Sequence, residues 1–286
     1  MHYCLMETDL GVLGLAWSGD GIVRLQLPER TRAATEQRLL RRARSGWSAA
    51  DLPLIDEARE LLQGVPVRYG HVIVDEAQDL TPMQLRMIVR RAVGAFTILG
   101  DVAQATGPVP YSQWSEVLAQ LPGGEHAEVE ELRHAYRVPR EIMSLALPLL
   151  DHIAPDVEPP VAYRAGAEPP RIVRAESPLD AAYAEAAELA EVEGLLAVIA
   201  PPSLRGDAEA APGSLFDDTR LSILTPREAK GMEFDHVIVV EPALIVEEAV
   251  GGHAQGLREL YVALTRPTTT LVIVHSRPLP PELDSA

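Results

Sequence analysis

The fold of this chain is decided by the stretch Val72-Ile73-Val74-Asp75-Glu76-Ala77-Gln78-Asp79. Its three apolar, β-branched residues predict a short, fully apolar strand, and two adjacent carboxylates follow at the carboxyl end. Ligands of open α/β sheets bind at the carboxyl ends of the strands, so we expect Asp75 and Glu76 to lie at a binding site. In phosphoryl transfer the first acid of such a pair can hold Mg²⁺ while the second orients or deprotonates water. Taken alone, the stretch is equally typical of a strand that leads into an acidic helix start.

Short apolar runs recur further along the chain and alternate with helical segments. Strands are expected over residues 97–99, 196–199, 237–240 and 271–274, and helices over residues 82–92 and 179–192. This alternation indicates a parallel sheet covered on both faces, so the predicted fold class is α/β. Two stretches rich in Gly, Pro, Ala and acidic residues, 201–213 and 242–256, are expected to be loops.

The first 46 residues are expected to form a small unit of their own. Two β-prone runs, 3–17 and 22–27, are joined through Ser18-Gly19-Asp20-Gly21, which is typical of a hairpin turn. A helix is expected over residues 31–44. Another is expected over residues 52–62, with Asp51 as its N-cap.

Composition and charge exclude several classes of protein. The chain has 286 residues, 47% of them hydrophobic, which suits two domains and argues against wholesale disorder. One cysteine, Cys4, excludes a disulfide framework and suits a reducing cytoplasm, where we expect the protein to be. Neither a leader peptide nor an apolar stretch of about 18 residues is present, so no membrane association is expected. The net charge of −17 repels phosphate backbones, so DNA binding by this chain alone should be weak.

Four more segments carry polar side chains next to predicted strands and helices. In chain order they are Leu99-Gly100-Asp101-Val102-Ala103-Gln104, Leu132-Arg133-His134-Ala135-Tyr136-Arg137 (expected to open a helix), Leu224-Thr225-Pro226-Arg227-Glu228-Ala229-Lys230-Gly231-Met232-Glu233-Phe234 and Glu259-Leu260-Tyr261-Val262-Ala263-Leu264-Thr265-Arg266. Each segment alone could be a capped helix or a surface charge pair. Together with residues 72–79, in this order and spacing, they are far more specific.

In that order the five segments resemble motifs II to VI of the UvrD/Rep-like superfamily 1 helicases, over residues of about 65–275. The resemblance implies RecA-like parallel sheets that bind ATP and Mg²⁺. It also implies that Asp75 coordinates Mg²⁺ and that Glu76 activates the attacking water. Gln104 would sense the γ-phosphate, while Arg137 and Arg266 would stabilise the charge that develops on it.

The same resemblance implies further contacts with the nucleotide. Glu233 would contact the sugar and Tyr136 would lie near the base. Gly100, Asp101 and Gly231 belong to the same motifs and are expected to contribute to nucleotide binding.

A finer match points to one branch of these motors. The tracts at 47–53, 81–86, 136–139 and 225–231 are similar to the HelD-type, RNA polymerase-recycling ATPases of actinobacteria. DNA-unwinding relatives usually carry a histidine near position 227 and a serine at position 138, where this chain has Arg227 and Val138. The match implies RNA polymerase as a partner. Two alternatives stay open: a fragment of a UvrD-type ATP-dependent 3'-5' DNA helicase, and a non-catalytic module that binds polymerase or a motor subunit.

The phosphate-binding loop of such a motor is missing from this sequence. A P-loop reads G-x-x-x-x-G-K-[ST], but the only lysine is Lys230, and no glycine lies in the five residues before it. We therefore expect little ATP turnover by the chain alone. The expected domains are a unit over 1–46, a partial first RecA-like domain over 47–125 and a nearly complete second one over 126–286.

Residues 1–46 stand where the P-loop would be expected. Segments 7–11, 15–17, 21–29 and 33–35 resemble the N-terminal strands of methylated-DNA–protein cysteine methyltransferases. The Pro-Cys-His-Arg motif that carries the chemistry of that family does not occur here, so no alkyl transfer is expected. A gene fusion and a truncated reading frame both remain open as explanations for the joint near residue 46.

Overall fold

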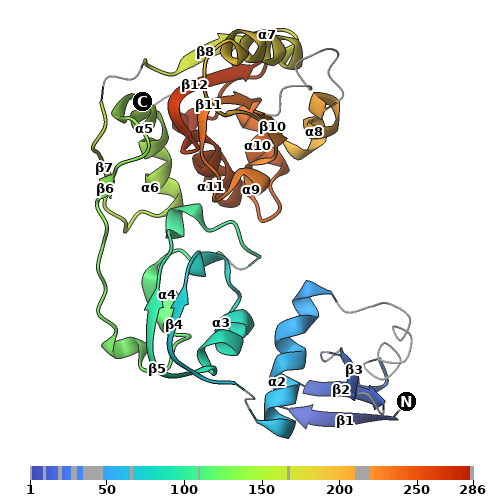
Figure 1. Ribbon diagram of the computed structural model, residues 1–286. Helices are drawn as coiled ribbons and strands as arrows, with labels where there is room; N and C mark the ends of the chain where they lie inside the picture. Colours follow the sequence, from blue (N-terminus) through green and yellow to red (C-terminus); the bar gives the residue numbers. More distant parts are fainter. Residues whose placement is uncertain are drawn as a thin grey trace. The chain divides into compact units, whose positions relative to one another are not determined.

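The computed structural model describes residues 2–8, 11–18, 21–26, 31–34, 48–64, 67–108, 110–165, 168–209 and 220–283. The chain forms two compact units, each of which is described by itself (Figure 1). Unit 1 comprises Met1–Asp75, Leu80–Leu99 and Gln120–Pro122, and unit 2 comprises Glu76–Asp79, Gly100–Ala119 and Gly123–Ala286. These units are defined by internal contacts, and the domain boundaries expected at residues 46 and 125 stay a prediction.

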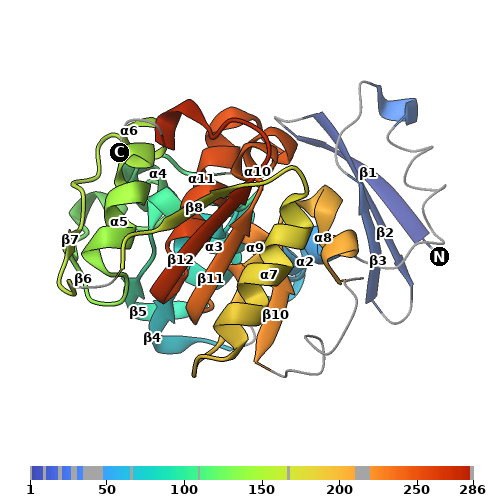
Figure 2. The ribbon, with the colours of Figure 1, turned by 90° about the horizontal axis from the view of Figure 1, so that it is seen from above.

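Unit 2 is built on a five-stranded parallel sheet, which confirms the α/β class. The strands are β8 (Arg171–Arg174), β9 (Leu196–Ile199), β10 (Leu221–Leu224), β11 (Phe234–Val240) and β12 (Pro267–His275), in the order β10-β9-β11-β12-β8. Every neighbouring pair is parallel, as Figure 2 shows from above. The strands expected at 196–199, 237–240 and 271–274 are confirmed. β8 and β10 had not been expected, because their polar residues break up the apolar run.

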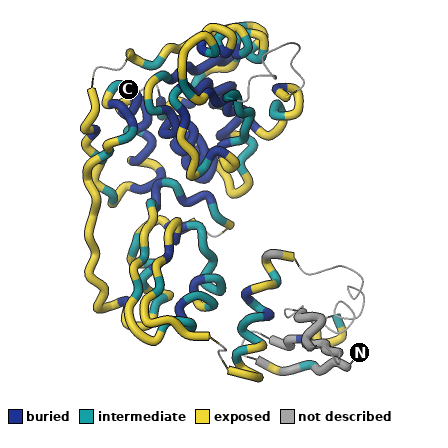
Figure 3. Tube along the Cα trace, in the orientation of Figure 1, coloured by how far each residue is buried: buried dark blue, intermediate teal, exposed yellow. Residues whose placement is uncertain are grey.

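Alternate residues of this sheet enter two separate hydrophobic cores. Val237 and Val239 of β11 face one core together with Leu260 of α11 (His253–Leu264). Ile238, the residue between those valines, faces the other core together with Ala182 of α7 (Pro178–Ala190). The expected sheet with both faces covered is therefore confirmed, and the strands form the buried centre of the unit in Figure 3.

Both stretches expected to be loops in unit 2 contain helices, so that prediction was wrong. Residues 202–209 form α8 (Pro202–Glu209), and residues 242–248 form α10 (Pro242–Glu248), after which α11 begins at residue 253. Each of the first two helices begins on a proline, which suits the first turn because its missing N–H has no intrahelical partner there. Proline marked a helix start in these places and not a loop. Residues 210–213 lie outside the described part of the chain.

The remaining elements of unit 2 are short. They are α4 (Trp114–Leu118), β6 (His134–Ala135), α5 (Arg140–Ala146), α6 (Leu150–Ile153), β7 (Val161–Ala162) and α9 (Pro226–Ala229). The 3-10 turns are η2 (Ala77–Asp79), η3 (Val102–Gln104), η4 (Gly124–His126), η5 (Leu147–Leu149) and η7 (Pro281–Leu283). The segment around Tyr136 forms a strand and a connection instead of opening a helix, because Pro139 keeps the residue before it out of the helical region. Helix α5 begins only at residue 140. Among the described residues, every helix is too short or too polar to cross a membrane.

Unit 1 begins with a three-stranded antiparallel sheet. Its strands are β1 (His2–Thr8), β2 (Gly11–Ser18) and β3 (Gly21–Gln26), so the run expected as one strand over 3–17 is in fact two. Thr8 pairs with Gly11 at the end of the β1–β2 register. The pairing of Ser18 with Gly21 confirms the expected hairpin. The helix expected over 31–44 lies outside the described residues beyond position 34.

The second part of unit 1 is a two-stranded parallel sheet with little cover. It consists of β4 (Tyr69–Val74) and β5 (Ala92–Ile98), with α3 (Pro82–Val89) between them in the chain. The helix ends before residue 92, where the next strand begins, so its expected end was three residues too late. Ile73 is 69% exposed, so the cover on both faces that was expected of the parallel sheet is not found at this strand. The strand forms as expected, but two strands and the packed helices leave part of the sheet open.

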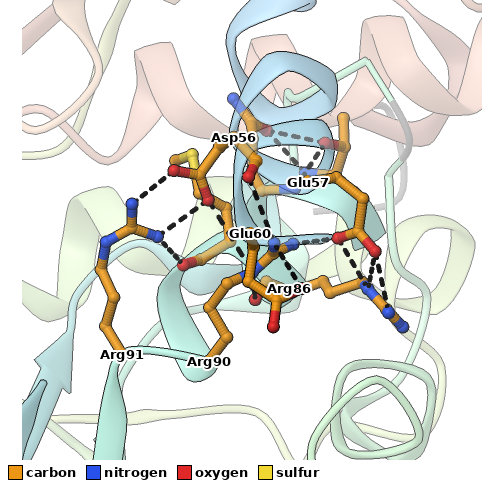
Figure 4. A network of polar contacts seen from close by, with 9 residues as sticks. Asp56, Glu57, Glu60, Arg86, Arg90 and Arg91 are labelled. Carbon is orange, nitrogen blue, oxygen red and sulfur yellow. Dashed lines mark hydrogen bonds and ion pairs between the residues drawn. The ribbon is translucent and has the colours of Figure 1, made fainter. Parts of the chain in front are cut away.

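Ion pairs connect α2 (Leu52–Gln63) to α3 and the turn after it (Figure 4). Arg90 pairs with Glu57 and approaches Asp56 and Glu60 at 3.7 Å, and Arg91 pairs with Asp56. The hydrogen bond from Arg91 lowers the pKa of Asp56. Burial works to raise the pKa of Glu57, but hydrogen bonds from the arginines outweigh it, and the pKa is lowered.

Two helix starts in unit 1 show different local chemistry. Thr81 and Gln84 form a capping box at α3, in which the Gln84 amide donates to Thr81 Oγ1 over 3.3 Å. Asp51 stands at the N-cap position of α2 as expected, but it makes no capping hydrogen bond to that helix. Its carboxylate instead accepts hydrogen bonds from the amide and hydroxyl of Ser48, at 2.9 and 2.6 Å.

Candidate functional site

Unit 2 brings most of the predicted site residues into one network of polar contacts. Its members come from segments far apart in the sequence: residues 76–79, 101–107, 137, 230–233 and 266. Two 3-10 turns, η2 and η3, carry the first two segments, and α9 and α11 precede the last two. The hydrogen bonds of this network therefore join residues up to 162 positions apart in the sequence.

Arg266 lies at the centre of this network, directly after α11, and only 1% of it is exposed. Its Nε donates to the Val262 carbonyl over 3.0 Å, Nη1 to the Met232 carbonyl over 3.1 Å, and Nη2 to Gln104 Oε1 over 2.8 Å. All of these acceptors are neutral oxygens. Burial, and secondarily the charge of Arg137, lower the pKa of Arg266 to about 10, so it stays protonated at neutral pH. A buried cation with neutral partners is suited to receive an anion.

Gln104 is held in one orientation by contacts at both ends of its amide. Its Nε2 donates to Asp101 Oδ2 over 2.8 Å, while its Oε1 accepts from Arg266. Asp101 is fixed in turn, because its other oxygen accepts from the Ala103 amide over 2.9 Å at the start of η3. The side-chain oxygen of Gln104 therefore faces Arg266. This orientation would let Gln104 respond to a negative charge bound beside Arg266.

Arg137 and Glu233 form an ion pair at the edge of the network. Arg137 Nη1 and Glu233 Oε1 lie 2.5 Å apart, and Arg137 Nε is buried without a hydrogen-bond partner among the described residues. Glu233 thus contacts the arginine here, and its expected role at a sugar stays a prediction. Tyr136, the neighbour of Arg137, is largely exposed.

Glu76 occupies a backbone conformation that few residues adopt. Its φ angle is 52°, in the left-handed region that costs a non-glycine residue energy and recurs at functional sites. Its carboxylate accepts a hydrogen bond from Gln78 Nε2 over 2.6 Å. Gln78 in turn accepts from the Asp101 amide over 3.1 Å, which connects the glutamate to the Gln104 segment.

Asp75, the predicted Mg²⁺ ligand, is the last residue of the first segment of unit 1 and follows β4 directly. It is exposed. Within the described part of the chain, no group of three or more His, Cys, Asp and Glu side chains is arranged to hold a metal ion. The role of Asp75 therefore stays a prediction.

Lys230 is a site residue that the sequence had not identified. Its Nζ lies 2.5 Å from Asp79 Oδ2 and 3.7 Å from Glu76 Oε2, and it also donates to the Gln104 carbonyl. Asp79 accepts hydrogen bonds from the amides of Thr106 and the following glycine, both at 2.9 Å. One ammonium group therefore connects the 76–79 segment to the 104–107 segment. The sequence did contain one feature that could have identified Lys230: it is the only lysine among the 25 lysine and arginine residues.

At two of the predicted nucleotide-binding glycines, the local structure itself favours glycine over a larger residue. A Cβ on Gly100 would lie 2.1 Å from Gln78 Oε1, so a larger residue would displace the glutamine. Gly231 has a φ of +76°, which favours glycine. Neither observation tests a contact with nucleotide, which stays a prediction for both.

Arg227 connects two of the predicted motifs. Its Nε lies 2.6 Å from Glu259 Oε1, and the glutamate side chain is nearly buried in α11. Thr225 and Glu228 form a capping box that starts α9 and so positions the arginine. Arg227, the residue that departs from the helicase pattern, therefore joins the segment at 225–231 to the segment at 259–266.

No protein-family model and no curated protein matches this sequence. Among solved structures, the chain is similar to the C-terminal domain of a possible DNA helicase from Lactobacillus plantarum WCFS1, with 18% identity over 52% of this chain and 92% of that domain, and a TM-score of 0.37. It is also similar to the arterivirus nonstructural protein 10 helicase in complex with DNA, with 18% identity over 73% of this chain and 41% of that one (TM-score 0.42). A second structure of the arterivirus helicase gives 14% identity over 95% and 72% (TM-score 0.42).

Proposed function

We propose that the polar network of unit 2 binds the terminal phosphate of a nucleoside triphosphate, and that this chain is the C-terminal motor portion of a superfamily 1 helicase-like ATPase. The observation that carries the proposal is Arg266, a buried guanidinium whose hydrogen bonds all go to neutral oxygens. An incoming phosphate would give this guanidinium a charged acceptor in direct contact, and Arg137 would add a second donor fork. Arginines aimed at a transferring phosphoryl group act mainly on charge that develops during reaction.

The other members of the network fit roles around that phosphate. Gln104 touches Arg266 and is oriented by Asp101, so it would register whether the terminal phosphate is present. Glu76 is the proposed base or orienting group for the attacking water. ATP is the proposed substrate.

Asp75 is the proposed ligand of Mg²⁺, an ion that commonly takes one or two carboxylates in addition to substrate phosphates. When bound, it would neutralise charge on the phosphates. The side chains of this chain would bind the terminal phosphate and orient the attacking water.

The chain alone should hydrolyse ATP very slowly, because its sequence contains no P-loop to cradle the phosphates. We expect turnover well below about 1 s⁻¹, the low end for ordinary enzymes. The test is a steady-state ATPase assay of the full chain beside its Glu76→Gln variant. A turnover above that value that disappears in the variant would contradict this part of the proposal.

We further propose RNA polymerase as the partner, in a HelD-like role that couples ATP hydrolysis to release of polymerase from nucleic acid. The support is Arg227, which stands where DNA-unwinding relatives carry a histidine and which pairs with Glu259. The net charge of −17 also disfavours a phosphate backbone as the main partner. Binding by this chain alone should be weak.

Two affinities measured side by side at physiological salt test the partner. RNA polymerase should bind this chain more tightly than single-stranded DNA does. Tight, salt-sensitive DNA binding without polymerase binding would favour the UvrD-type helicase alternative. Polymerase binding without any nucleotide binding would favour the non-catalytic module.

A further inference from the structure

Two identical tripeptides lie side by side in unit 2. Ala135-Tyr136-Arg137 and Ala162-Tyr163-Arg164 are 27 positions apart in the sequence. The parallel strands β6 and β7 pair His134 with Val161 and Ala135 with Ala162, so each tyrosine and each arginine follows its counterpart in register. Figure 1 shows the two strands next to each other. The first tripeptide belongs to the proposed phosphate site, whereas nothing has yet assigned a role to the second.

The two tyrosine rings form an exposed aromatic pair. Their centroids are 5.2 Å apart with planes tilted by 41°, yet Tyr136 is 64% exposed and Tyr163 is 70% exposed. The ring of His134 lies 6.3 Å from that of Tyr136 and extends the aromatic surface. Because both tyrosines stay more than half exposed while in contact, the pair keeps open aromatic area that could stack on a flat ligand.

The backbone beneath the rings is well fixed. The Val161 amide donates to the Arg133 carbonyl and the Tyr163 amide to the Ala135 carbonyl, both over 2.8 Å. Beyond the strands, the Arg140 amide donates to the Arg164 carbonyl over 2.9 Å. A rigid support lowers the entropic cost of ordering the rings around a ligand.

Two arginines lie at one end of the pair, and one of them, Arg137, is paired with Glu233. Arg164 Nη1 donates to the Arg137 carbonyl over 3.1 Å, and the structure shows no carboxylate paired with Arg164 among the described residues. An extended polyanion is disfavoured there, because exposed acidic residues stand near the two strands in the sequence. They are Glu128, Glu130, Glu131, Glu158 and Glu168, of which Glu131 and Glu158 pair with Arg133. The surface therefore suits a single nucleotide better than a nucleic-acid strand.

We propose that Tyr163 and Arg164 complete, with Tyr136, a platform on which the base of the bound nucleotide stacks, and that Tyr163 is a determinant of affinity for the base. This inference rests on the proposed phosphate site, because Arg137 joins the two: it follows Tyr136 in the chain and pairs with Glu233, whose neighbour Met232 accepts a hydrogen bond from Arg266. A base on the tyrosines and phosphates at the arginines would occupy neighbouring parts of the same unit.

The experiment compares ATP with inorganic tripolyphosphate, which has the phosphates but no base. Their affinities for the full chain are measured by ligand-observed NMR titration. In the unchanged protein, ATP should bind more tightly than tripolyphosphate. Tyr163→Ala should weaken ATP binding roughly 5- to 150-fold, the range for removing one base–aromatic stack, and leave tripolyphosphate binding unchanged. Tyr163→Phe should bind ATP like the unchanged protein, because it keeps the ring.

The matched control is Tyr69→Ala, which removes another exposed tyrosine, in β4 of unit 1, and should change neither affinity. If Tyr163→Ala weakened the binding of ATP and of tripolyphosphate equally, Tyr163 would have a structural role and the inference would be overturned. ATP and tripolyphosphate binding equally in the unchanged protein would overturn the base platform but leave the phosphate site intact. Failure of both ligands to bind would overturn the phosphate site as well. If Tyr163→Ala weakened the binding of a single-stranded oligonucleotide but not that of ATP, the platform would be assigned to nucleic acid and the proposal would be overturned.

Discussion

The strands β4 and β11 have similar apolar sequences but very different surroundings. Val72-Ile73-Val74 in unit 1 and Val237-Ile238-Val239 in unit 2 follow the same pattern and are both strands. Ile238 is fully buried because β9 and β12 flank its strand and helices cover both faces, whereas Ile73 is 69% exposed on a two-stranded sheet. An apolar β-branched run predicts that a strand forms, but how deeply it is buried depends on how many neighbours the fold supplies.

The two units also differ in what holds their helices. Those of unit 2 pack through two apolar cores on either face of the sheet. In unit 1, α2 and α3 are joined by the ion pairs of Asp56 and Glu57 with three arginines. Apolar burial responds little to salt or acid, whereas ion pairs respond to both. The units should therefore respond differently to mutation, salt and pH.

The largest expected difference is between Ile238→Ala and Ile73→Ala. The same atoms are removed in both variants, so only the surroundings differ. Ile238→Ala should lower the free energy of unfolding by about 2–5 kcal/mol, because it leaves a cavity in a packed core. Ile73→Ala should change it by less than about 0.5 kcal/mol, as an exposed substitution does. Urea unfolding followed by circular dichroism measures both. A comparable loss for Ile73→Ala would show that this face of β4 is covered in solution.

A second contrast lies within the ion pairs of unit 1. Arg90 is 11% exposed at its side chain and reaches three carboxylates, while Arg86 is 62% exposed and pairs with Glu57. Arg90→Ala should cost about 1–3 kcal/mol, because three partly buried carboxylates lose a charged donor. Arg86→Ala, the control, should cost less than about 1 kcal/mol. Hydrogen exchange of the α2 and α3 amides measures each loss within unit 1. Equal costs for the two variants would contradict the assignment of Arg90 as the main link.

In unit 2, charge matters at Lys230. Lys230→Met keeps most of the chain length but removes the ammonium group that contacts Asp79 and Gln104, and should cost roughly 1–2 kcal/mol. Hydrogen exchange should rise in residues 76–79 and 104–107 and not in the distant β8. Lys230→Arg keeps the charge but replaces a compact donor with a planar fork, and should recover only part of the loss. Exchange that rises evenly over unit 2 would mean that the lysine does not specifically join those segments.

The smallest expected effect is a difference in response to acid. The pKa values of Asp56 and Glu57 are lowered in the fold from their ordinary 3.8 and 4.5. A lowered carboxyl pKa stabilises the fold above the unfolded value, and the contribution is lost as pH falls through the folded value. Protection of the α2 amides should therefore decrease below about pH 4, by on the order of 1 kcal/mol or less. The decrease should be smaller in Glu57→Gln, and an identical pH profile in that variant would contradict this cause.

The sequence predicted the parts of the fold that depend on local pattern. Fully apolar runs such as Leu196–Ile199 were predicted as strands, and the pairing of the strands that end at Ser18 and begin at Gly21 was predicted from the residues between them. β8 was missed because arginines stand at both of its ends, and α8 was mistaken for a loop because a proline begins it. These elements depend on neighbours and on position within the element, which a local pattern does not contain.

The candidate site shows the same division. Motif order was enough to select Gln104, Arg137 and Arg266, which the structure places in one network in unit 2. The contact of Lys230 with Asp79 spans 151 positions, and no local pattern predicts such a pair. Tyr163 was missed although its tripeptide repeats that of Tyr136, because only the pairing of β6 with β7 brings the two together.

The central claim is that Arg266 is placed to meet a terminal phosphate, and affinities for ATP and ADP test it most directly. Titration calorimetry or NMR on the full chain gives both constants for the unchanged protein and for Arg266→Gln, which removes the charge. The unchanged protein should bind ATP roughly 10- to 150-fold more tightly than ADP, the value of about 1.5–3 kcal/mol for hydrogen bonds to a charged group. In Arg266→Gln the two affinities should become nearly equal, with the affinity for ADP little changed. Equal affinities for ATP and ADP in the unchanged protein, or a full preference for ATP in a folded Arg266→Gln variant, would contradict the account.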